Sequence, residues 1–469
     1  MRDASVHFKR CLLAAAVATL PGLGMAAAAD SAMTPGADAL AAPEPDAVGR
    51  YVLPPNVFRP DSSVRRAEDR GQRVHTNYVM HNRNGVKVNR LEDLAVPAPE
   101  ANPAPNATFA EYPASLACIA KVGPAYSGCV PTNNAAYNAT GGGRAIVIVD
   151  AYDYPTAAAD LATFSSFFGL PAANFTKVIA NGNGACVTPP YNSGWALEAA
   201  LDVQWAHAMA PKAKIILVEA CSNSWADMMY AEQIAIQQAN AAGGGEISNS
   251  WGGAEWSTES TDWDWVFRSN WVANKPVNFF FSAGDSGLGA QFPSASPWVT
   301  SVGGTTINRD PTTQAFLSES CWAGSGGGTS AYETYSSTFG SGTGPWTNYQ
   351  YPLFGQAARH SPDISFDADP ASGAYVYNAG SWYVVGGTSL AAPLVAGITN
   401  TSNNRLGMAP KAGGYFTNAQ NNLLYAELLT NKDYGVNFYD VTTGNNGAAA
   451  AVGWDQCTGV GSPRGRVGK

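Results

Sequence analysis

"RAIVIVDAYDYPTAAADLATFSSFFG", residues 144–169, decides the fold, because it joins a short apolar run ending in aspartate to a helix-like stretch. The same alternation continues with the apolar runs AKIILVEAC (213–221), VNFFFSAGDSG (277–287) and WVTSVGGTT (298–306), and with the helix-like stretches SGWALEAALDVQWAHAMAP (193–211) and WADMMYAEQIAIQQANAAGG (225–244). Buried runs that alternate with helical segments indicate a mostly parallel sheet covered by helices on both faces. We therefore expect an α/β fold.

A candidate nucleophile follows one of the later apolar runs. Ser389 lies in VVGGTSLAAPLVAG (384–397), where two glycines and a threonine precede it and a proline follows four residues later. In α/β sheets, functional sites collect at the carboxyl ends of the strands. Stretches of this shape carry the serine of subtilisin-like proteases, whose hydroxyl needs a base, usually a histidine. The chain has five histidines, and none stands in the H-G-T-H setting of a subtilisin.

Two acids offer an alternative base. The stretch 193–211 predicts a helix capped by Ser193 and ended by Pro211. Glu198 and Asp202 are four residues apart and therefore share one face of this helix. They are either two acids on a solvated helix edge or a coupled carboxyl pair that shares a proton. In the second interpretation, Glu198 accepts the proton of Ser389 while Asp202 orients Glu198, and such a base remains available at acidic pH.

A further acid, Asp285, follows the apolar run 277–282 within SAGDSG. Attack on a peptide carbonyl produces an oxyanion, which needs a hydrogen-bond donor. A protonated aspartic acid donates, whereas an ionised one repels the oxyanion. The alternative is an ordinary turn aspartate before glycine. Both proposed acid roles point to activity at low pH.

Taken together, these stretches resemble the sedolisin family, the serine-carboxyl peptidases. The similarity runs from about residue 113 to 465 and rests on the order and spacing of VDAYDYPTAAADLATF (149–164), EAALD (198–202), ISNSWGG (247–253), SAGDSG (282–287), FPSASPWVTSVGGT (292–305), SPDISFDADP (361–370), GGTSLAAP (386–393), YDVTTGNNG (439–447) and VGWDQCTGVGSP (452–463). The resemblance implies a subtilisin-like three-layer fold that cuts peptide bonds through an acyl-enzyme.

The resemblance also assigns the site. Glu198, Asp202 and Ser389 fall on the family's catalytic positions, and Asp285 falls on its oxyanion aspartate. Residues of SNSWGG, namely Ser250, Gly252 and Gly253, would border the substrate cleft. Whether the enzyme cuts inside chains or trims tripeptides stays open, because loop shape decides it.

One calcium ion near the carboxyl end belongs to the same resemblance. Asp440 and Asp455 match the two acidic ligands, and main-chain oxygens of Val441, Ala451 and Gly453 would complete the site. Calcium favours all-oxygen sites on irregular loops, and its role would be structural. The alternative is two ordinary loop aspartates.

The first 112 residues differ from the rest. Residues 1–29 read as an export signal with a basic start and an apolar run ending in MAAAAD, and a membrane anchor fits less well because the run is short and contains proline. Residues 30–112 are rich in proline and alanine, and only RVHTNYVMH (73–81) alternates like a strand. We expect an extended prosegment or linker before a peptidase domain at 113–469. This segment departs from the long folded prodomain usual in the family.

Six cysteines follow the signal, an even number that suggests disulfides in an exported chain. Of the 15 possible pairings, we favour Cys118–Cys129, Cys186–Cys221 and Cys321–Cys457. Nearness in sequence supports only the first two. The third would tie the end of the chain to the middle of the domain.

The charge limits the partners. The whole chain carries a formal charge of −9, and its lysines and arginines are scattered, so we expect polypeptide substrates and no nucleic acid. Residues 113–469 hold 15 basic and 24 acidic side chains, a sparse surface that depends little on ion pairs broken by acid. We expect a secreted monomer, extracellular or periplasmic, whose mature form has no membrane span.

Two rival hypotheses stay open. One is a histidine-dependent serine protease that uses His207 or His360, whose activity would fade below about pH 6. The other is an exported, catalytically inactive binding protein on a protease fold, because fold alone does not prove chemistry. Acid-dependent digestion of a denatured protein, compared with a Ser389→Ala variant, separates them.

Overall fold

The computed structural model describes residues 51–466, except residues 83–84, 86, 101–109, 182–185, 269–274, 335–349, 356–357, 403–407, 411–415 and 431–432. The expected export signal (1–29) and the start of the expected prosegment (30–50) lie outside the described residues. The described residues all belong to one compact unit, Asp38–Lys469.

The centre of this unit is an eight-stranded sheet whose neighbours run in the order β12 (Phe316–Cys321), β11 (Thr300–Arg309), β9 (Val277–Ser282), β7 (Gly245–Asn249), β4 (Ala145–Ala151), β6 (Lys214–Ala220) and β5 (Asn174–Ala180), with β15 (Ile364–Asp367) also paired to β11. Every pairing in it is parallel except that of β11 with β12. The expected α/β fold with a mostly parallel sheet is confirmed.

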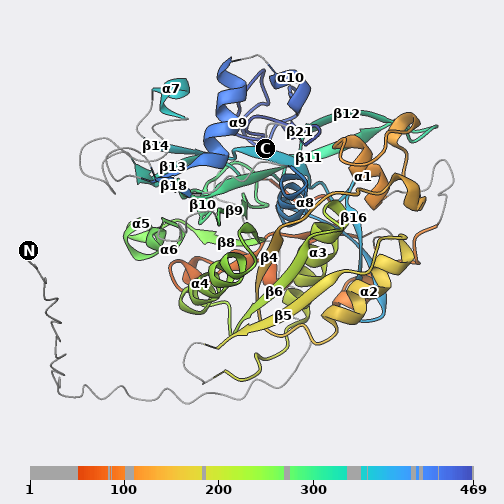
Figure 1. The fold of residues 1–469 in the computed structure, drawn as a ribbon, viewed down its shortest axis with the longest axis horizontal. Helices are drawn as coiled ribbons and strands as arrows, with labels where there is room; N and C mark the ends of the chain where they lie inside the picture. The colour runs from red at the N-terminus through yellow and green to blue at the C-terminus, as the bar shows by residue number, and fades with distance from the viewer. Residues whose placement is uncertain are drawn as a thin grey trace, which may run out of the picture. The chain divides into compact units, whose positions relative to one another are not determined.

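Helices cover both faces of this sheet (Figure 1), as the alternation of apolar side chains along β4 requires. Ile146 and Ile148 pack into the core beneath α2 (Ala157–Phe167), α3 (Ser193–Met209) and α8 (Thr388–Asn400), whereas Val147 and Val149 pack into the core beneath α4 (Trp225–Ala241). Because both faces are covered, the central strands are apolar throughout.

The expected start of α3 is wrong by one residue. Asn192, not Ser193, caps the helix, since its side chain accepts a hydrogen bond from the Trp195 N–H at 3.1 Å. Ser193 is the first helical residue. Asparagine and serine are about equally favourable at the N-cap position, so the sequence alone does not show whether Asn192 or Ser193 caps the helix.

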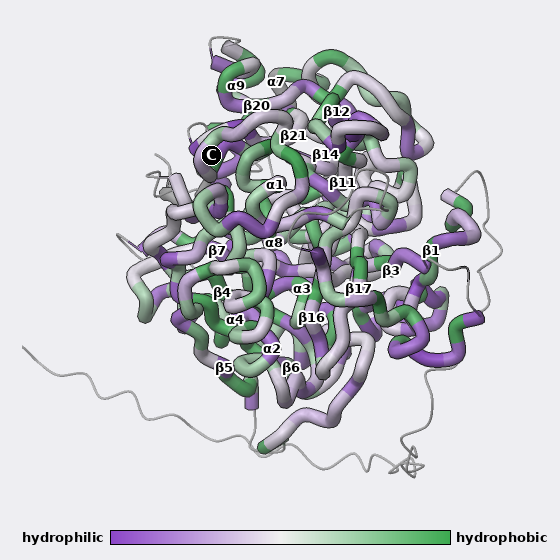
Figure 2. The backbone as a smooth tube through the Cα atoms, turned by 90° about the vertical axis from the view of Figure 1, so that its right-hand side faces the viewer, coloured by the Kyte–Doolittle hydropathy of each residue, from purple (hydrophilic) through white to green (hydrophobic). Residues whose placement is uncertain are grey.

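Two small sheets include the start of the described chain. One has the order β1 (Val57–Phe58), β3 (Val79–His81), β17 (Ser381–Gly386) and β16 (Ala374–Asn378), and the other has the order β10 (Gln291–Phe292), β8 (Trp251–Ala254) and β2 (His75–Thr76). Figure 2 shows β1 and β3 close to β17. Tyr78, Val79 and Met80 are fully buried. RVHTNYVMH, which was expected to alternate like one strand, forms the two short strands β2 and β3 and packs within the same unit as the large sheet.

The remaining elements are short and mostly peripheral. They are η1 (Asp61–Ser63), η2 (Ala67–Asp69), η3 (Leu91–Leu94), α1 (Pro113–Ile119), η4 (Ser127–Cys129), η5 (Ala135–Tyr137), α5 (Glu259–Asp262), α6 (Asp264–Arg268), β13 (Gly328–Thr334), α7 (Tyr351–Phe354), β14 (Ala358–Ser361), β18 (Met408–Pro410), β19 (Phe416–Asn418), α9 (Ala419–Thr430), α10 (Tyr434–Asn437), β20 (Phe438–Tyr439) and β21 (Ser462–Pro463). Among the described helices, none combines the length and apolar character needed to cross a bilayer.

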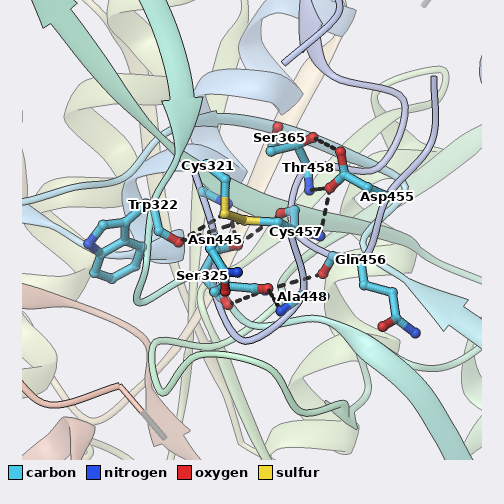
Figure 3. The surroundings of a disulfide bond; sticks show 12 residues. Cys321, Trp322, Ser325, Ser365, Asn445, Ala448, Asp455, Gln456, Cys457 and Thr458 are labelled. Carbon is cyan, nitrogen blue, oxygen red and sulfur yellow. Dashed lines mark hydrogen bonds between the residues drawn. A yellow bond between two sulfur atoms is a disulfide. The ribbon is translucent and has the colours of Figure 1, made fainter. Parts of the chain in front are cut away.

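All three expected disulfides are present: Cys118–Cys129, Cys186–Cys221 and Cys321–Cys457. Figure 3 shows the third, which joins the end of β12 to the loop that carries Asp455. The long connection it closes, 136 residues, is the kind for which a covalent link restricts the unfolded chain most.

Candidate active site

Ser389 is the second residue of α8, just after the turn that leaves β17. The turn requires a glycine at 387, whose φ of 103° is a left-handed conformation that disfavours other residues. A Cβ built on Gly387 would overlap both the Asn77 carbonyl oxygen and Asp285 Oδ2. Asp285 and Asn77 therefore both pack against the Gly387 backbone, within the turn that carries the nucleophile.

The predicted base is within hydrogen-bond reach of the serine. Ser389 Oγ donates to Glu198 Oε2 at 2.9 Å and also lies 3.1 Å from the Ser250 carbonyl oxygen. Glu198 and Ser389 are both 0% exposed, because α3 packs against α8. Burial raises the pKa of Glu198 well above its usual value, and the charges of Asp202 and Asp150 raise it further. The hydrogen bond from Ser389 opposes this shift.

Asp202 lies one helical turn beyond Glu198 and is also fully buried. Its Oδ1 accepts a hydrogen bond from Ser250 Oγ at 2.8 Å, which fixes the carboxyl group. Burial raises the pKa of Asp202 well above its usual value. Among the described residues, neither Glu198 Oε1 nor Asp202 Oδ2 has a hydrogen-bond partner, so each carboxyl group is held through one oxygen only, by Ser389 and Ser250 respectively.

A third acid, Asp150, was missed in the sequence analysis. It ends the apolar run of β4, is 1% exposed, and neither of its carboxyl oxygens has a partner within the described part of the chain. Burial raises its pKa well above the usual value, followed by the charges of Asp202 and Glu219. The only signal in the sequence was an aspartate at the carboxyl end of a buried strand, where α/β sites collect.

Asp285 follows β9 and faces the same space as the nucleophile's turn. Its Oδ1 accepts from the Thr388 N–H at 2.8 Å and from Thr388 Oγ1 at 2.9 Å. Burial raises the pKa of Asp285 to about 7, against the opposing effects of these hydrogen bonds and of Arg59. Oδ2 has no hydrogen-bond partner among the described residues, and it lies beside Gly387 near the Asn77 carbonyl oxygen, since a Cβ at this position would overlap both atoms. Below about pH 7 the protonated form of this carboxyl group predominates, and in that form Oδ2 can donate a hydrogen bond.

The histidines of the first rival hypothesis lie elsewhere. His207 Nε2 is 2.9 Å from the Pro171 carbonyl oxygen, and His360 Nδ1 is 3.0 Å from Thr329 Oγ1. The hydrogen-bond partners of Ser389 Oγ are Glu198, the Ser250 carbonyl and the Asn77 N–H. Burial lowers the pKa of both histidines, so both favour the neutral state.

The loop predicted to hold calcium brings oxygen atoms together around Asp440. Tyr434 Oη lies 3.1 Å from Asp440 Oδ1, 3.4 Å from the Gly453 carbonyl oxygen and 2.8 Å from the Val460 carbonyl oxygen. One hydroxyl proton cannot serve three acceptors at once. Val441, the next residue of the predicted set, is fully buried.

The second predicted carboxylate is occupied by its own loop. Asp455 accepts hydrogen bonds from the N–H groups of Ala451, Cys457 and Thr458 and from Thr458 Oγ1, part of which Figure 3 shows. Among the described residues, no three His, Cys, Asp or Glu side chains converge as a metal-binding group. Two carboxylates with main-chain oxygens are of the right chemistry for calcium, but a cation would have to replace N–H groups that now contact Asp455.

Known proteins resemble this chain along most of its length. The subtilase family model, Peptidase_S8, matches residues 151–448, more than half of the chain. Kumamolisin from Bacillus sp. (strain MN-32) is 32% identical over 361 residues, which cover 69% of this chain and 59% of kumamolisin. Sedolisin from Pseudomonas sp. (strain 101) is 28% identical over 342 residues, 65% of this chain and 53% of sedolisin. The chain thus matches little more than half the length of these relatives.

A solved structure has the same fold. Pseudomonas sedolisin, described as a serine-carboxyl proteinase complexed with two molecules of pseudo-iodotyrostatin, superposes with a TM-score of 0.59 at 24% identity, covering 76% of this chain and 96% of that one. This likeness confirms the subtilisin-like architecture that was expected from the sequence. The chain therefore belongs to the subtilase family and, among its members, to the sedolisins.

Proposed function

We propose that this protein is an acid-acting serine-carboxyl peptidase that hydrolyses peptide bonds through an acyl-enzyme on Ser389. Glu198 is the general base, Asp202 orients it, and Asp285 stabilises the oxyanion. One observation carries the proposal: Ser389 Oγ donates to a buried carboxylate oxygen of Glu198 at 2.9 Å, where a histidine would otherwise be required.

Acylation follows from these contacts. Ser389 Oγ attacks the carbonyl carbon of the scissile bond while its proton passes to Glu198 Oε2. The oxyanion accepts one hydrogen bond from the Ser389 N–H and a second from the protonated Oδ2 of Asp285. Glu198 then gives its proton to the leaving nitrogen, and a water molecule hydrolyses the ester by the reverse proton path.

The protonation of Asp285 ties the reaction to acidic and near-neutral pH, whereas the raised pKa of Glu198 sets the limit on the acid side. Asp150, Glu198 and Asp202 cannot all ionise together, because each is buried and each charge raises its neighbour's pKa. The hydrogen bond from Ser389 favours the ionised form of Glu198, as the hydrogen bond from Ser250 does for Asp202. Asp285 must keep its proton to donate, which its pKa of about 7 allows at acidic and near-neutral pH.

We propose that the protein is exported, with residues 1–29 as a signal and part of residues 30–112 as a prosegment. Three disulfides support an oxidising compartment, extracellular or periplasmic. We also propose one structural calcium ion on Asp440 and Asp455 with carbonyl oxygens of Val441, Ala451 and Gly453. The convergence of oxygens around Tyr434 supports this site, and a bound cation would hold the carboxyl-terminal loop.

Digestion of a denatured protein between pH 3 and 7 tests the activity, with Ser389→Ala as the matched variant. The substitution removes one hydroxyl group and leaves the buried surroundings in place. We expect acid-dependent digestion by the wild-type chain and none by the variant. Equal digestion by both, or digestion by neither after acid treatment, would instead favour an inactive protein on a protease fold.

A further inference from the structure

Residues 59–77 form a loop whose two ends meet in one small sheet. β1, just before the loop, pairs antiparallel with β3, just after it, matching Val57 with His81 and Phe58 with Met80. β3 is fully buried and also pairs with β17. Because the base of the loop is held by this pairing, the loop can lift from the molecule as a hinged unit while β1 and β3 stay together. Residues 59–77 are called the lid below.

The lid covers the candidate nucleophile. Within it, β2 pairs antiparallel with β8, matching His75 with Gly252. At its end, the Asn77 N–H donates to Ser389 Oγ at 3.1 Å, and the Ser389 N–H donates to the Asn77 carbonyl oxygen at 2.9 Å. A peptide substrate therefore reaches Ser389 and pairs with β8 only after the lid has moved.

The lid is basic, whereas the chain as a whole is acidic. Burial raises the pKa values of two neighbouring acids, Glu255 beyond β8 and Asp285 after β9, and the charges of Arg65 and Arg59 on the lid oppose these shifts. Arg59 also donates to the main-chain oxygen of Asp285 at 2.7 Å. The charged side chains of the lid besides His75 are Arg59, Asp61, Arg65, Arg66, Glu68, Asp69, Arg70 and Arg73.

His75 is the one histidine of the lid. Its Nδ1 lies 3.0 Å from the main-chain oxygen of Thr76, and its Nε2 is buried without a hydrogen-bond partner among the described residues. Burial lowers the pKa of His75 to about 4, against the opposing effect of the contact with Thr76. The charges of Arg65, Arg59 and Arg66 lower it further. The closed lid thus disfavours the charged imidazole.

A cavity of about 200 Å³ lies between this part of the lid and the loop after β9. Ser63, Arg65 and His75 line it on the lid side, and residues 283–291 line it on the other side. The contact between the lid and this loop is therefore incompletely packed beside the imidazole. Lifting the lid here separates less apolar surface than opening a close-packed interface would.

Resting on the function proposed above, we infer that residues 59–77 are a hinged lid over the active site and that protonation of His75 weakens its closure in acid. An imidazole released from the lid's contacts returns to a pKa of about 6.5, whereas that of the closed lid stays at about 4. Because the open lid binds the proton more tightly, a fall in pH between these values favours opening. From pH 7 to pH 4, His75 alone raises the ratio of open to closed lid roughly 100-fold.

Two other groups beside the lid titrate as well. Covering Asp285 raises its pKa to about 7, so protonation of this acid favours the closed lid and opposes His75. Glu255 also has a raised pKa and faces the charge of Arg65. The response of the whole lid combines these groups, and a substitution of His75 isolates the share of the imidazole because it leaves both acids in place.

Amide hydrogen exchange between pH 4 and pH 7 tests the inference, in a Ser389→Ala chain that does not digest itself during the measurement. The reporters are the N–H groups of Val74 and Asn77, which donate to the carbonyl oxygens of Asn223 and Ser250. After correction for the intrinsic pH dependence of exchange, the opening ratio of this parent relative to His75→Gln should rise roughly 100-fold from pH 7 to pH 4.

His360→Gln is the matched control. Burial also lowers the pKa of His360 to about 4, but this residue lies in β14, outside the lid. We expect its lid amides to exchange as those of the parent do. The pKa of the His75 imidazole, followed by NMR in the parent, gives a second measurement that does not depend on the folding of any His75 variant, and we expect a value near 4.

The possible outcomes separate the lid, the sensor and the proposed function. Exchange of Val74 and Asn77 only together with the amides of β4 would show that no separate lid opens. A ratio of parent to His75→Gln that stays constant with pH, or an imidazole pKa of 6.5 or above, overturns His75 as the sensor. Either result, beside digestion of a denatured protein by the Ser389 chain at pH 4, leaves the proposed function intact. The expected exchange without such digestion overturns the proposed function and leaves an acid-sensitive lid on an inactive chain.

Discussion

Replacing Asp285 by asparagine separates two roles of this side chain, donation to the oxyanion and support of the nucleophile's turn. Oδ1 accepts both hydrogen bonds from Thr388, and Oδ2 lies beside Gly387, where we propose that the oxyanion forms. An asparagine that keeps its oxygen on Thr388 presents its NH₂ group where Oδ2 stood. Asp285→Asn therefore retains a donor at every pH, whereas Asp285→Ala retains none.

The expected size of the effect follows from the pKa of about 7 that burial gives Asp285. At pH 8 about one tenth of such groups still carry a proton, so this residue alone lowers the wild-type rate roughly tenfold between pH 6 and 8. The asparagine variant lacks that titration, and its rate relative to wild type should rise about tenfold over the same range. Loss of the donor in the alanine variant should lower kcat by about 10²- to 10³-fold.

The assay is initial-rate hydrolysis of a quenched fluorescent peptide by acid-treated protein from pH 3 to 8, with thermal melting at each pH to confirm folding. Asp433→Asn, on an exposed loop, is the matched control and should follow the wild-type profile. A constant ratio of the Asp285→Asn rate to the wild-type rate across pH 6 to 8 would refute protonated Asp285 as the donor. So would equal rates for the asparagine and alanine variants.

Three other expectations follow from the buried acids and the carboxyl-terminal loop. Asp150→Asn removes a charge that raises the pKa of Glu198, so the acid limb of the kcat profile should move to lower pH; a limb that stays or rises contradicts this. Burial raises the pKa values of Asp264, Asp285 and Glu319 to about 7. Their stabilising contribution is complete below the unfolded pKa of about 4 and is lost as pH rises through 7, by up to about 3–4 kcal/mol per group; melting temperatures that rise from pH 4 to 8 would count against it. Removing calcium with a chelator should lower the melting temperature of the wild-type chain by several degrees and leave that of Asp440→Ala unchanged; no change in the wild-type chain argues against the ion.

Local patterns were enough to predict the parallel sheet, the helices α2, α3 and α4, and the spacing of Glu198 and Asp202. The helical repeat puts these acids on one face, and the turn before Ser389 needs glycine, so each feature is encoded within a few residues. The third disulfide was favoured without support from nearness in sequence, and the packing of β12 against the carboxyl-terminal loop supplies its reason.

Features that depend on distant contacts could not be predicted in this way. Asp150 reads as an ordinary strand end until α3 places Asp202 beside it. RVHTNYVMH alternates like a strand, yet nothing local says that its partners are β8 and β17, about 175 and 300 residues away. The composition of residues 30–112 indicated an extended segment, and only the tertiary structure reveals that part of it lies in the active site.

The claim on which everything else depends is that Ser389 gives its proton to a carboxylate and not to an imidazole. The most direct measurement is the single-turnover acylation rate of acid-treated protein from pH 3 to 7, compared among wild type, Glu198→Gln and His207→Phe. We predict fast acylation at pH 4, a loss of at least about 10³-fold in Glu198→Gln, and little change in His207→Phe. A wild-type rate that falls away below about pH 6, together with an active Glu198→Gln variant, would contradict it.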